Sequence, residues 1–266
     1  MSLSAEIQRF GLACGASWRV IWAVMLRDIR TRFFNHGLGY LLAISWPVAH
    51  ILVLLGFYTL LGRHAPYGQS IELFFATALV PFMAWNYMSR FIMLSLVINR
   101  ALLAFPAVKI FDVLVGRAIL EVLASLAMLG LLVVLARFAG IDARPADFVS
   151  AAAAMATALA LGLGCGVLSA VIAMVMPGWV TIYTLLIIAA YILSGIVFVP
   201  SALPPDLAAA LAWVPTLHLV EWMRVAYYDG YPAQLLDRGY VLSWAAATLL
   251  AGLALERAIR GRLLGG

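Results

Sequence analysis

The sequence predicts an all-α membrane protein with six transmembrane helices, an N-terminal interfacial helix and a re-entrant helix pair. Of the 266 residues, 65% are hydrophobic and 11% are charged, whereas a soluble domain has about 45–50% apolar and about 25% charged residues. Two stretches, residues 33–62 and 148–205, carry no formal charge, and each exceeds the roughly 20 residues that cross a bilayer. The alternation of a membrane β-strand is absent.

Residues 16–34 predict an amphipathic helix that lies in the headgroup plane. At 100° per residue, one apolar face is formed by Trp18, Trp22, Met25, Ile29 and Phe33. Another face carries Arg19, Arg27 and Arg30. Basic residues beside an aromatic face are typical of interfacial helices. The alternative is an ordinary juxtamembrane stretch that only sets the topology.

The six predicted spans follow the uncharged and weakly charged stretches of the chain. They are residues 38–62, 71–99, 111–138, 148–176, 179–199 and 239–256. Pro177 and Gly178 predict the tight turn between the fourth and fifth spans. Three glycines of the fourth span predict close packing against neighbouring helices; they are Gly162, Gly164 and Gly166.

Residues 203–228 contain two apolar pieces separated by prolines, each too short to cross a bilayer. We interpret them as a re-entrant helix pair that enters from the outer face and is buried against protein. Three polar residues on the second piece are spaced to form one stripe: His218, Glu221 and Arg224. Internal hydrogen bonding is the simpler role for this stripe, and a functional role is the alternative.

The basic residues predict that this inner-membrane protein has both termini in the cytoplasm. Apart from Arg90 and Arg117, ten basic residues fall on the side of the termini and five on the other side, and cytoplasmic loops carry the excess of Lys and Arg. A seventh span at 203–228 would place the three arginines after residue 256 outside, which the same rule disfavours. The net charge of +5 is thus an orientation signal, and we expect no nucleic-acid partner.

The chain lacks the motifs of an enzyme. It has no HExxH, no nucleophile elbow and no Walker A loop. Its two cysteines, Cys14 and Cys165, predict no disulfide framework. The sequence therefore predicts no catalytic residue, no metal site and no cofactor on this chain, and any ATP would be bound by a separate protein.

Charged residues inside predicted spans are costly and are candidates for function. Arg90 lies near the middle of the second span beside Asn86 and Tyr87. It could contact an anionic substrate or headgroup; the alternatives are a structural pair with Glu121 or a position nearer the cytosol. Arg117 is four residues before Glu121, so these two side chains can also pair on one helix.

Aromatic residues are frequent in the first and fifth spans: Tyr40, Trp46, Phe57, Tyr58, Tyr183, Tyr191 and Phe198. Aromatic faces can stack on sugar rings. Membrane-interface belts and core packing are the alternative, and composition alone favours that alternative.

Five stretches, in this order and spacing, resemble one family. They are LRDIRTRF (26–33), GYLLAISWPVAHILVLLG (39–56), ALVPF (78–82), NRALLAFPAVKIFDVLVGRAILE (99–121) and VPTLHLVEWMRVAYYDGY (214–231). Together they resemble the KpsM-like group of ABC-2 type permeases of capsular polysaccharide export. One departure is Trp46-Pro47, where the family pattern suggests an acidic residue before the proline.

The resemblance implies a homodimer that exports a lipid-linked polysaccharide, with ATP and Mg²⁺ on separate cytoplasmic ATPase subunits. It also implies a periplasmic co-polymerase or adaptor and an outer-membrane export protein as partners. The ATPase would dock on a coupling helix that contains Arg100, Phe105, Pro106 and Lys109. The interfacial helix would be a gate, where Arg19, Arg27, Arg30 and Arg32 meet the lipid linker, since guanidinium pairs well with phosphate.

Under this resemblance, Arg90 and the aromatic residues of the first and fifth spans become candidates for the channel lining. The re-entrant pair would shape the periplasmic exit. The nearest alternative is a sister permease for O-antigen or teichoic acid. An intramembrane enzyme acting on lipid-linked sugars and an ion-coupled secondary transporter are further alternatives, but the sequence shows neither an acid cluster nor paired repeats.

Overall fold

The computed structural model of the chain describes the backbone of residues 3–31, 39–62 and 64–264. Side chains are described within these ranges except at 3–10, 13, 31, 39–44 and 262–264. The described residues form helices and no strands. The helices are α1 (Leu3–Thr31), α2 (Gly39–Leu60), α3 (Ile71–Ile98), α4 (Ile110–Phe138), α5 (Phe148–Val175), α6 (Trp179–Leu193), α7 (Pro205–Leu211), α8 (Pro215–Tyr227) and α9 (Arg238–Leu264), with short 3-10 turns at Leu102–Ala104 and Pro200–Ala202.

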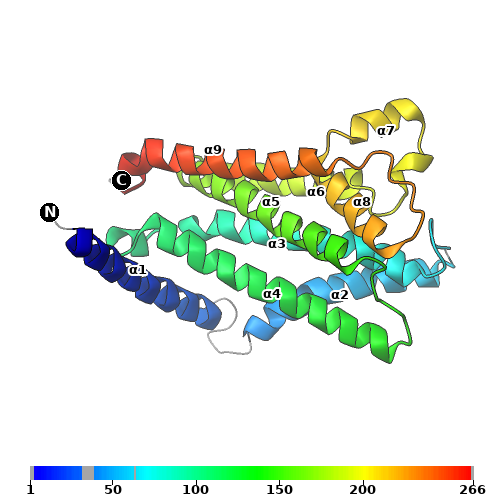
Figure 1. Cartoon of the computed structure of the whole chain (residues 1–266), viewed down its shortest axis with the longest axis horizontal. Helices are drawn as coiled ribbons and strands as arrows, with labels where there is room; N and C mark the ends of the chain where they lie inside the picture. The colour runs from blue at the N-terminus through cyan, green and yellow to red at the C-terminus, as the bar shows by residue number, and fades with distance from the viewer. Residues whose placement is uncertain (1–2, 32–38, 63, 265–266) are drawn as a thin grey trace.

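The long helices run side by side along the longest axis of the molecule (Figure 1). Both termini and the connection between α3 and α4 lie at one end, which we call the termini end. The α2–α3 and α4–α5 loops lie at the opposite end with α7 and α8, and we call this the α8 end. Helices that alternate in direction between two ends are the arrangement expected for a membrane-spanning bundle.

Four described helices are long and apolar enough to cross a membrane: α3, α4, α5 and the Arg238–Gly261 part of α9. Two further apolar helical stretches, Ser45–Leu60 of α2 and all of α6, are shorter. The fifth span was predicted at 179–199, but its helix is shorter than that range, because α6 ends at Leu193. Gly195 follows with φ +75°, a left-handed conformation that favours glycine and ends the helix.

Helix α5 is central and packs against α3 on one side and α9 on the other. A Cβ placed on Gly162 would lie 2.9 Å from the Trp85 carbonyl oxygen of α3. One placed on Gly164 would lie 2.7 Å from the Ala245 carbonyl oxygen of α9. The backbones approach so closely that only glycine fits, which confirms the close packing predicted from the glycines of this span.

Helix α1 begins at Leu3, well before the predicted start at residue 16, and one side of it packs against the bundle. Ile21 and Met25 are buried against α4, where the Ile21 carbonyl oxygen would lie 3.4 Å from a Cβ on Gly116. Trp18 and Trp22, on the predicted apolar face, are 55% and 52% exposed. Helix α1 packs closely on α4 at Gly116, and this contact determines which side of α1 is buried. The periodicity of α1 alone cannot indicate where that contact forms.

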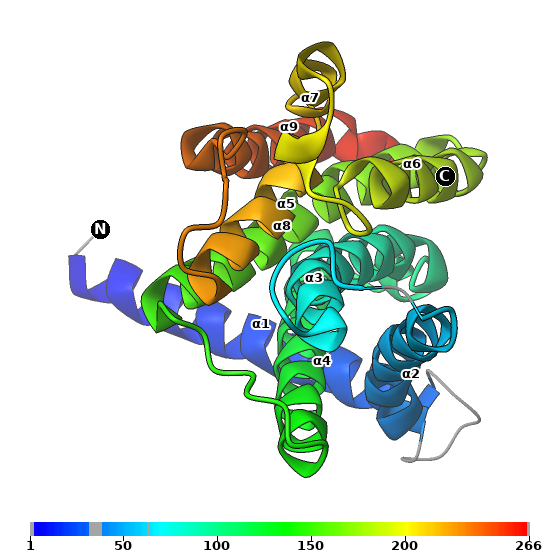
Figure 2. The ribbon, with the colours of Figure 1, turned by 90° about the vertical axis from the view of Figure 1, so that its right-hand side faces the viewer.

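Two helices form between 203 and 228, as the prolines predicted. Pro205 and Pro215 stand at the first turns of α7 and α8, where the missing amide hydrogen of proline costs nothing. Helix α8 is buried among α3, α5 and α9, whereas α7 stands away from the bundle (Figure 2). Burial of α8 against protein satisfies the condition for a helix that does not cross the membrane.

Candidate functional site

The α3–α4 connection at the termini end presents an exposed surface. Phe105 is 60% exposed, and the side chains of Arg100, Pro106 and Lys109 are also exposed. Leu103 and Ile110 are buried and anchor the segment to the bundle. The expected coupling helix is a single 3-10 turn, Leu102–Ala104. The sequence predicted the position of this segment. The longer coupling helix that the resemblance implied does not form, because Pro106 prevents a longer helix here.

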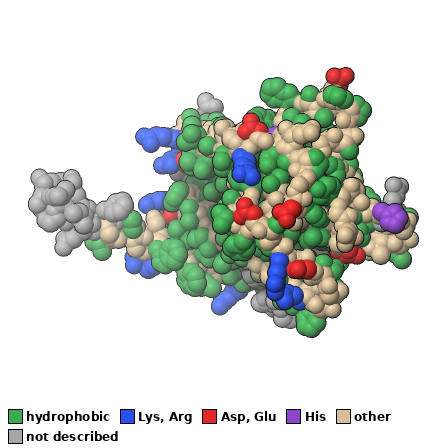
Figure 3. Space-filling model, turned by 45° about the vertical axis from the view of Figure 1, so that its right-hand side comes forward, with side chains coloured by type: hydrophobic (Ala, Val, Ile, Leu, Met, Phe, Trp, Pro, Cys, Tyr) green, Lys and Arg blue, Asp and Glu red, His purple; other side chains and the backbone are tan. Residues whose placement is uncertain are grey.

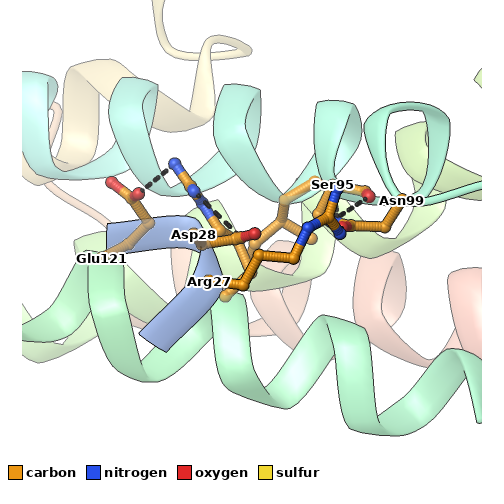
Figure 4. A network of polar contacts seen from close by, with 7 residues as sticks. Arg27, Asp28, Ser95, Asn99 and Glu121 are labelled. Carbon is orange, nitrogen blue, oxygen red and sulfur yellow. Dashed lines mark hydrogen bonds and ion pairs between the residues drawn. The ribbon is translucent and has the colours of Figure 1, made fainter. Parts of the chain in front are cut away.

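A buried asparagine joins this connection to α1. Asn99, at the end of α3, is 1% exposed, and its Nδ2 donates to the Ser95 carbonyl oxygen at 2.9 Å. Arg27 of α1 donates from Nη1 to Asn99 Oδ1 (Figure 4). The α3–α4 connection and α1 are therefore joined by a hydrogen bond from a charged donor, one of the stronger kinds.

The neighbouring residue of α1 takes part in a buried ion network with α4. Arg117 lies 2.7 Å from Glu121 Oε1 through Nη2 and 3.4 Å from Asp28 Oδ2 through Nη1 (Figure 4). All three residues are less than 9% exposed. The guanidinium also lies over the Phe91 ring of α3, 4.7 Å from its centroid. Arg117 thus ties α1, α3 and α4 together at one point.

The pairing of Arg117 with Glu121 agrees with the i, i+4 prediction, and the pairing with Asp28 was missed. Asp28 is the one acid in a run of arginines, and sequence spacing gives no indication of a partner 89 residues away. The partner found for Glu121 is Arg117, whereas Arg90 is exposed on α3.

The basic residues predicted at the entrance differ in their surroundings. Arg19 and Arg30 are exposed, while Arg27 is directed toward Asn99. Arg32 lies outside the described residues. Several Lys and Arg side chains gather at the termini end in Figure 3, with acidic side chains nearer the α8 end, so the sign of the surface charge differs between the two ends.

At the α8 end, Arg224 is fully buried and held by internal contacts. Its Nη1 donates to the Phe198 carbonyl oxygen at 3.0 Å, and its Nη2 donates to the Ile196 carbonyl oxygen at 3.1 Å. The guanidinium carbon lies 3.9 Å above the centroid of the Phe74 ring. These carbonyls follow the end of α6, so Arg224 holds the irregular chain that leads from α6 toward α7.

The other two residues of the predicted polar stripe are also bound internally. Glu221 accepts a hydrogen bond of 2.6 Å from the Tyr231 hydroxyl. His218 Nδ1 accepts from the Asp237 amide at 3.0 Å, which leaves Nε2 to donate to the Ala212 carbonyl oxygen at 2.8 Å. His218, Glu221 and Arg224 thus fix the loops around α8, which favours the structural role over a catalytic one.

The candidate channel residues differ in exposure. Arg90 is exposed on α3. On α2, Trp46 is 70% and Phe57 is 56% exposed, and the Tyr40 side chain lies outside the described residues. Tyr183 is buried at 6%.

Other candidates form ring contacts between helices. The Tyr58 ring lies 4.4 Å from that of Phe75. The Tyr191 ring lies 5.3 Å from Phe82 and 6.1 Å from His50. Phe198 is half-buried. Tyr191 therefore joins α2, α3 and α6 along one seam, which sequence spacing could not indicate.

The described residues contain no group of three His, Cys, Asp or Glu side chains placed to hold a metal ion. Their buried charges are Asp28, Asp112, Arg117, Glu121, Glu221, Arg224 and Glu256. Long apolar helices with internally paired charges define a polytopic membrane protein.

Comparison with known proteins identifies the family. The chain is 31% identical over 235 residues to the polysialic acid transport protein KpsM of Escherichia coli, covering 88% of this chain and 91% of that protein. It is 25% identical over 237 residues to the capsule polysaccharide export inner-membrane protein CtrC of Neisseria meningitidis serogroup A, covering 89% of each chain. It is 24% identical over 240 residues to BexB of Haemophilus influenzae, a capsule polysaccharide export inner-membrane protein, covering 90% of each chain. No family model matches the chain. The chain belongs to the KpsM family of capsule polysaccharide export inner-membrane proteins.

Proposed function

We propose that this chain is the permease subunit of an ABC exporter that moves lipid-linked capsular polysaccharide across the bacterial inner membrane. The observation that carries this function is the match to KpsM over 91% of that protein's length. The membrane-type helical bundle supports it. A separate ATPase supplies the energy, and this chain contributes the transport path without catalysing a reaction.

The proposed topology has six crossings, made by α2 to α6 and α9, with both termini in the cytoplasm. Its support is the position of both termini and the α3–α4 connection at one end of the bundle (Figure 1). Helix α6 has 15 residues and so spans about 22 Å, so the irregular segment up to residue 199 completes the crossing of a core about 30 Å thick. The pair α7 and α8 enters from the periplasmic side.

The proposed partner at the termini end is a cytoplasmic ATPase that binds ATP and Mg²⁺. It docks on the exposed residues of the α3–α4 connection: Arg100, Phe105, Pro106 and Lys109. A displacement of this segment is transmitted to α1 through the hydrogen bond between Asn99 and Arg27 and through the ion network of Arg117. Helix α1 then acts as the gate, and Arg19 and Arg30 are free to attract the phosphate of a lipid linker.

Reversing the charge of Lys109 is expected to uncouple the ATPase. In Lys109→Glu, we expect export to fall at least about tenfold, since an interfacial charge reversal costs more than 1.4 kcal/mol. The protein should still reach the membrane, because Lys109 is exposed. Export in cells, amount of membrane-inserted permease and ATPase co-purification are the measurements. Arg144→Glu, an exposed change on the α4–α5 loop, is the control. Normal export in Lys109→Glu and in a Pro106 variant would refute the docking assignment.

A second copy of the chain is proposed to pack against the side of the bundle formed by α2 and α6. Both helices lie on the same side of α3 (Figure 2). Val53 is 73% exposed, and Leu185 and Ile192 are each 62% exposed. An export path between two copies would be bordered by these faces and by the aromatic seam. A periplasmic co-polymerase or adaptor and an outer-membrane export protein continue the route.

Arg90 is expected to contact the transported anion, because it is exposed and no ion pair forms with it among the residues that the structure describes. We expect Arg90→Ala to lower export roughly tenfold, the loss typical of one contact to a charged group. The amount of folded permease should not change. Capsule on the cell surface and permease in the membrane are measured together, with Arg90→Lys as the charge-conserving control. A drop in permease amount equal to the drop in capsule would assign Arg90 a structural role instead.

The function itself is tested by deletion and co-purification. Deleting the gene should leave capsular polysaccharide inside the cell, and plasmid-borne permease should restore surface capsule. Co-expression with the cognate ATPase should give one complex that contains both chains. Loss of O-antigen or teichoic acid with intact capsule would instead identify a sister permease. The proposal would be refuted if the permease purifies without the ATPase and the deletion strain keeps all of its surface polymers.

A further inference from the structure

A groove between α4, α5 and α9 has not been used by the proposed transport path. It has a volume of about 410 Å³, and every side chain that lines it is apolar. Ala118 and Val122 of α4 line it together with Leu163 of α5. Phe111 of α4 and Leu253 of α9 lie at its edges and remain 59% and 41% exposed. We call this site the α4–α9 groove.

The α4–α9 groove is separate from the face proposed for the second copy. No residue of α2 or α6 lines it. These two helices lie across the bundle from the opening between α4 and α9 (Figure 2). An occupant of the groove would therefore face the surrounding membrane and not the export path.

The dimensions of the groove favour a lipid chain over a protein helix. Its lining runs along α4 from Phe111 to Leu123, about 18 Å at 1.5 Å per residue. This is a little more than half of a hydrocarbon core about 30 Å thick, so it corresponds to one leaflet. A helix is about 10 Å across, and one of that length would leave most of its surface outside a groove of about 410 Å³.

Positive charge stands at the end of the groove that is nearest the termini end. Lys109 precedes Phe111 by two residues and is exposed, with only a long 3.5 Å contact from Nζ to Ser17 Oγ. Arg257 lies one helical turn beyond Leu253 and is also exposed. The side chains of Val108 and Ile259 each pack against the same hydrophobic cluster, which includes Ile110 and Leu114 of α4 and Val167 of α5.

The acidic groups in this region do not cancel that charge. Glu256 is bound by Arg260, with Nε donating to Oε1 at 2.8 Å and Nη2 donating to Oε2 at 2.9 Å. Asp112 is fully buried and accepts from the Lys109 amide at 3.2 Å. Among the side chains that the structure describes, Lys109 and Arg257 are thus two cations without an acidic partner at this end of the apolar groove.

We propose that the α4–α9 groove holds one acyl chain of an anionic membrane phospholipid, whose phosphate lies between Lys109 and Arg257. The lipid is a resident of the membrane and is not the exported glycolipid. It fills the space between α4 and α9 beside the ATPase docking segment, and the cations select an anionic headgroup over a zwitterionic one.

Lipid retention by the purified full-length chain tests this site. Detergent-solubilised protein is mixed with phosphatidylglycerol or phosphatidylcholine of identical acyl chains, and bound lipid is counted by native mass spectrometry. The wild-type chain should retain phosphatidylglycerol about tenfold more strongly, because each cation near the surface strengthens anionic lipid binding. Ala118→Phe, which places a large side chain in the lining of the groove, should lower the retention of both lipids.

Two further variants separate the groove from the charge. Arg257→Gln removes an exposed charge without altering the packing, and it should reduce the preference for phosphatidylglycerol to roughly threefold. Ala247→Phe, at an exposed alanine of α9 that does not line the groove, should retain both lipids as the wild type does. The proposal is overturned if Ala118→Phe retains lipid normally or if Arg257→Gln keeps the full preference. It is equally overturned if the wild-type chain retains only a glycolipid.

Discussion

Replacing Arg117 with leucine is expected to release α1 from the bundle. Among substitutions of charged residues at the termini end, we expect this one to cause the largest loss of stability. Arg117→Leu leaves Asp28 and Glu121 without the guanidinium that lies 3.4 and 2.7 Å from them. Removing one partner of a buried ionic network costs about 3–5 kcal/mol, since the remaining charges stay desolvated. The apparent melting temperature of the detergent-purified protein should fall accordingly.

The release of α1 can be measured separately from global unfolding. Ile21 is 6% exposed beneath α4, so a cysteine at Ile21→Cys, in a background without the two native cysteines, should react slowly with a thiol reagent. Adding Arg117→Leu should speed this reaction severalfold at temperatures where the rest of the chain remains folded. Arg117→Lys should give an intermediate rate, because an ammonium cannot bridge two carboxylates as a planar guanidinium does.

Arg137 provides a matched control for Arg117. It lies in the last turn of the same helix and is exposed, so Arg137→Leu should change neither the melting temperature nor the labelling of residue 21. If Arg117→Leu melts like the wild type and leaves the cysteine protected, the network does not hold α1. Loss of export with α1 still protected would likewise count against the proposed link between the docking segment and the gate.

The second large effect is expected at the centre of the bundle. A side chain on Gly164 would meet the Ala245 carbonyl oxygen at 2.7 Å and the Leu249 amide nitrogen at 2.9 Å. These are backbone atoms of α9, which cannot move aside as a side chain would. Gly164→Leu should therefore separate α5 from α9 and cost about 3 kcal/mol or more. We expect little folded protein after detergent extraction, measured by size-exclusion chromatography and thermal melting.

Gly164→Ala and Gly130→Leu make the test specific. Gly164→Ala adds only the Cβ, so this variant should fold and melt at a lower temperature than the wild type. Gly130 lies in α4, and a Cβ there would meet nothing within 4 Å. Replacing a helix glycine with leucine at such a site should raise stability by up to about 1 kcal/mol. Equal losses at Gly164 and Gly130 would show that the α5–α9 contact is not the cause.

Much of the fold could be predicted from local sequence signals. The ends of α3, α4 and α5 lie within one residue of the predicted ends, because uncharged stretches, Ser70 and Asp147 caps and the Pro177–Gly178 turn act on neighbouring residues. The position of the helix pair at 203–228 followed from its prolines. The end of α6 was missed, because the apolar stretch continues past Leu193 while the backbone turns at Gly195.

The candidate site was predicted in outline and not in its contacts. The sequence indicated the docking segment by resemblance and the Arg117–Glu121 pair by spacing. It gave no indication that Asn99 would meet Arg27 or that Arg117 would meet Asp28. Such pairs join residues 72 and 89 positions apart, and their meeting depends on how closely α1 approaches α3 and α4.

By itself, the sequence determined that this protein is a helical membrane protein, which stretches form its helices, and which end carries the positive charge. These properties follow from local hydrophobicity, capping and charge, and each acts over a few residues. Only the tertiary structure decided which face of α1 is buried, which charges are paired and which, like Arg90, stay exposed. Those outcomes depend on the approach of distant helices, which is set by surfaces such as those at Gly116 and Gly164 and is not encoded in any single segment.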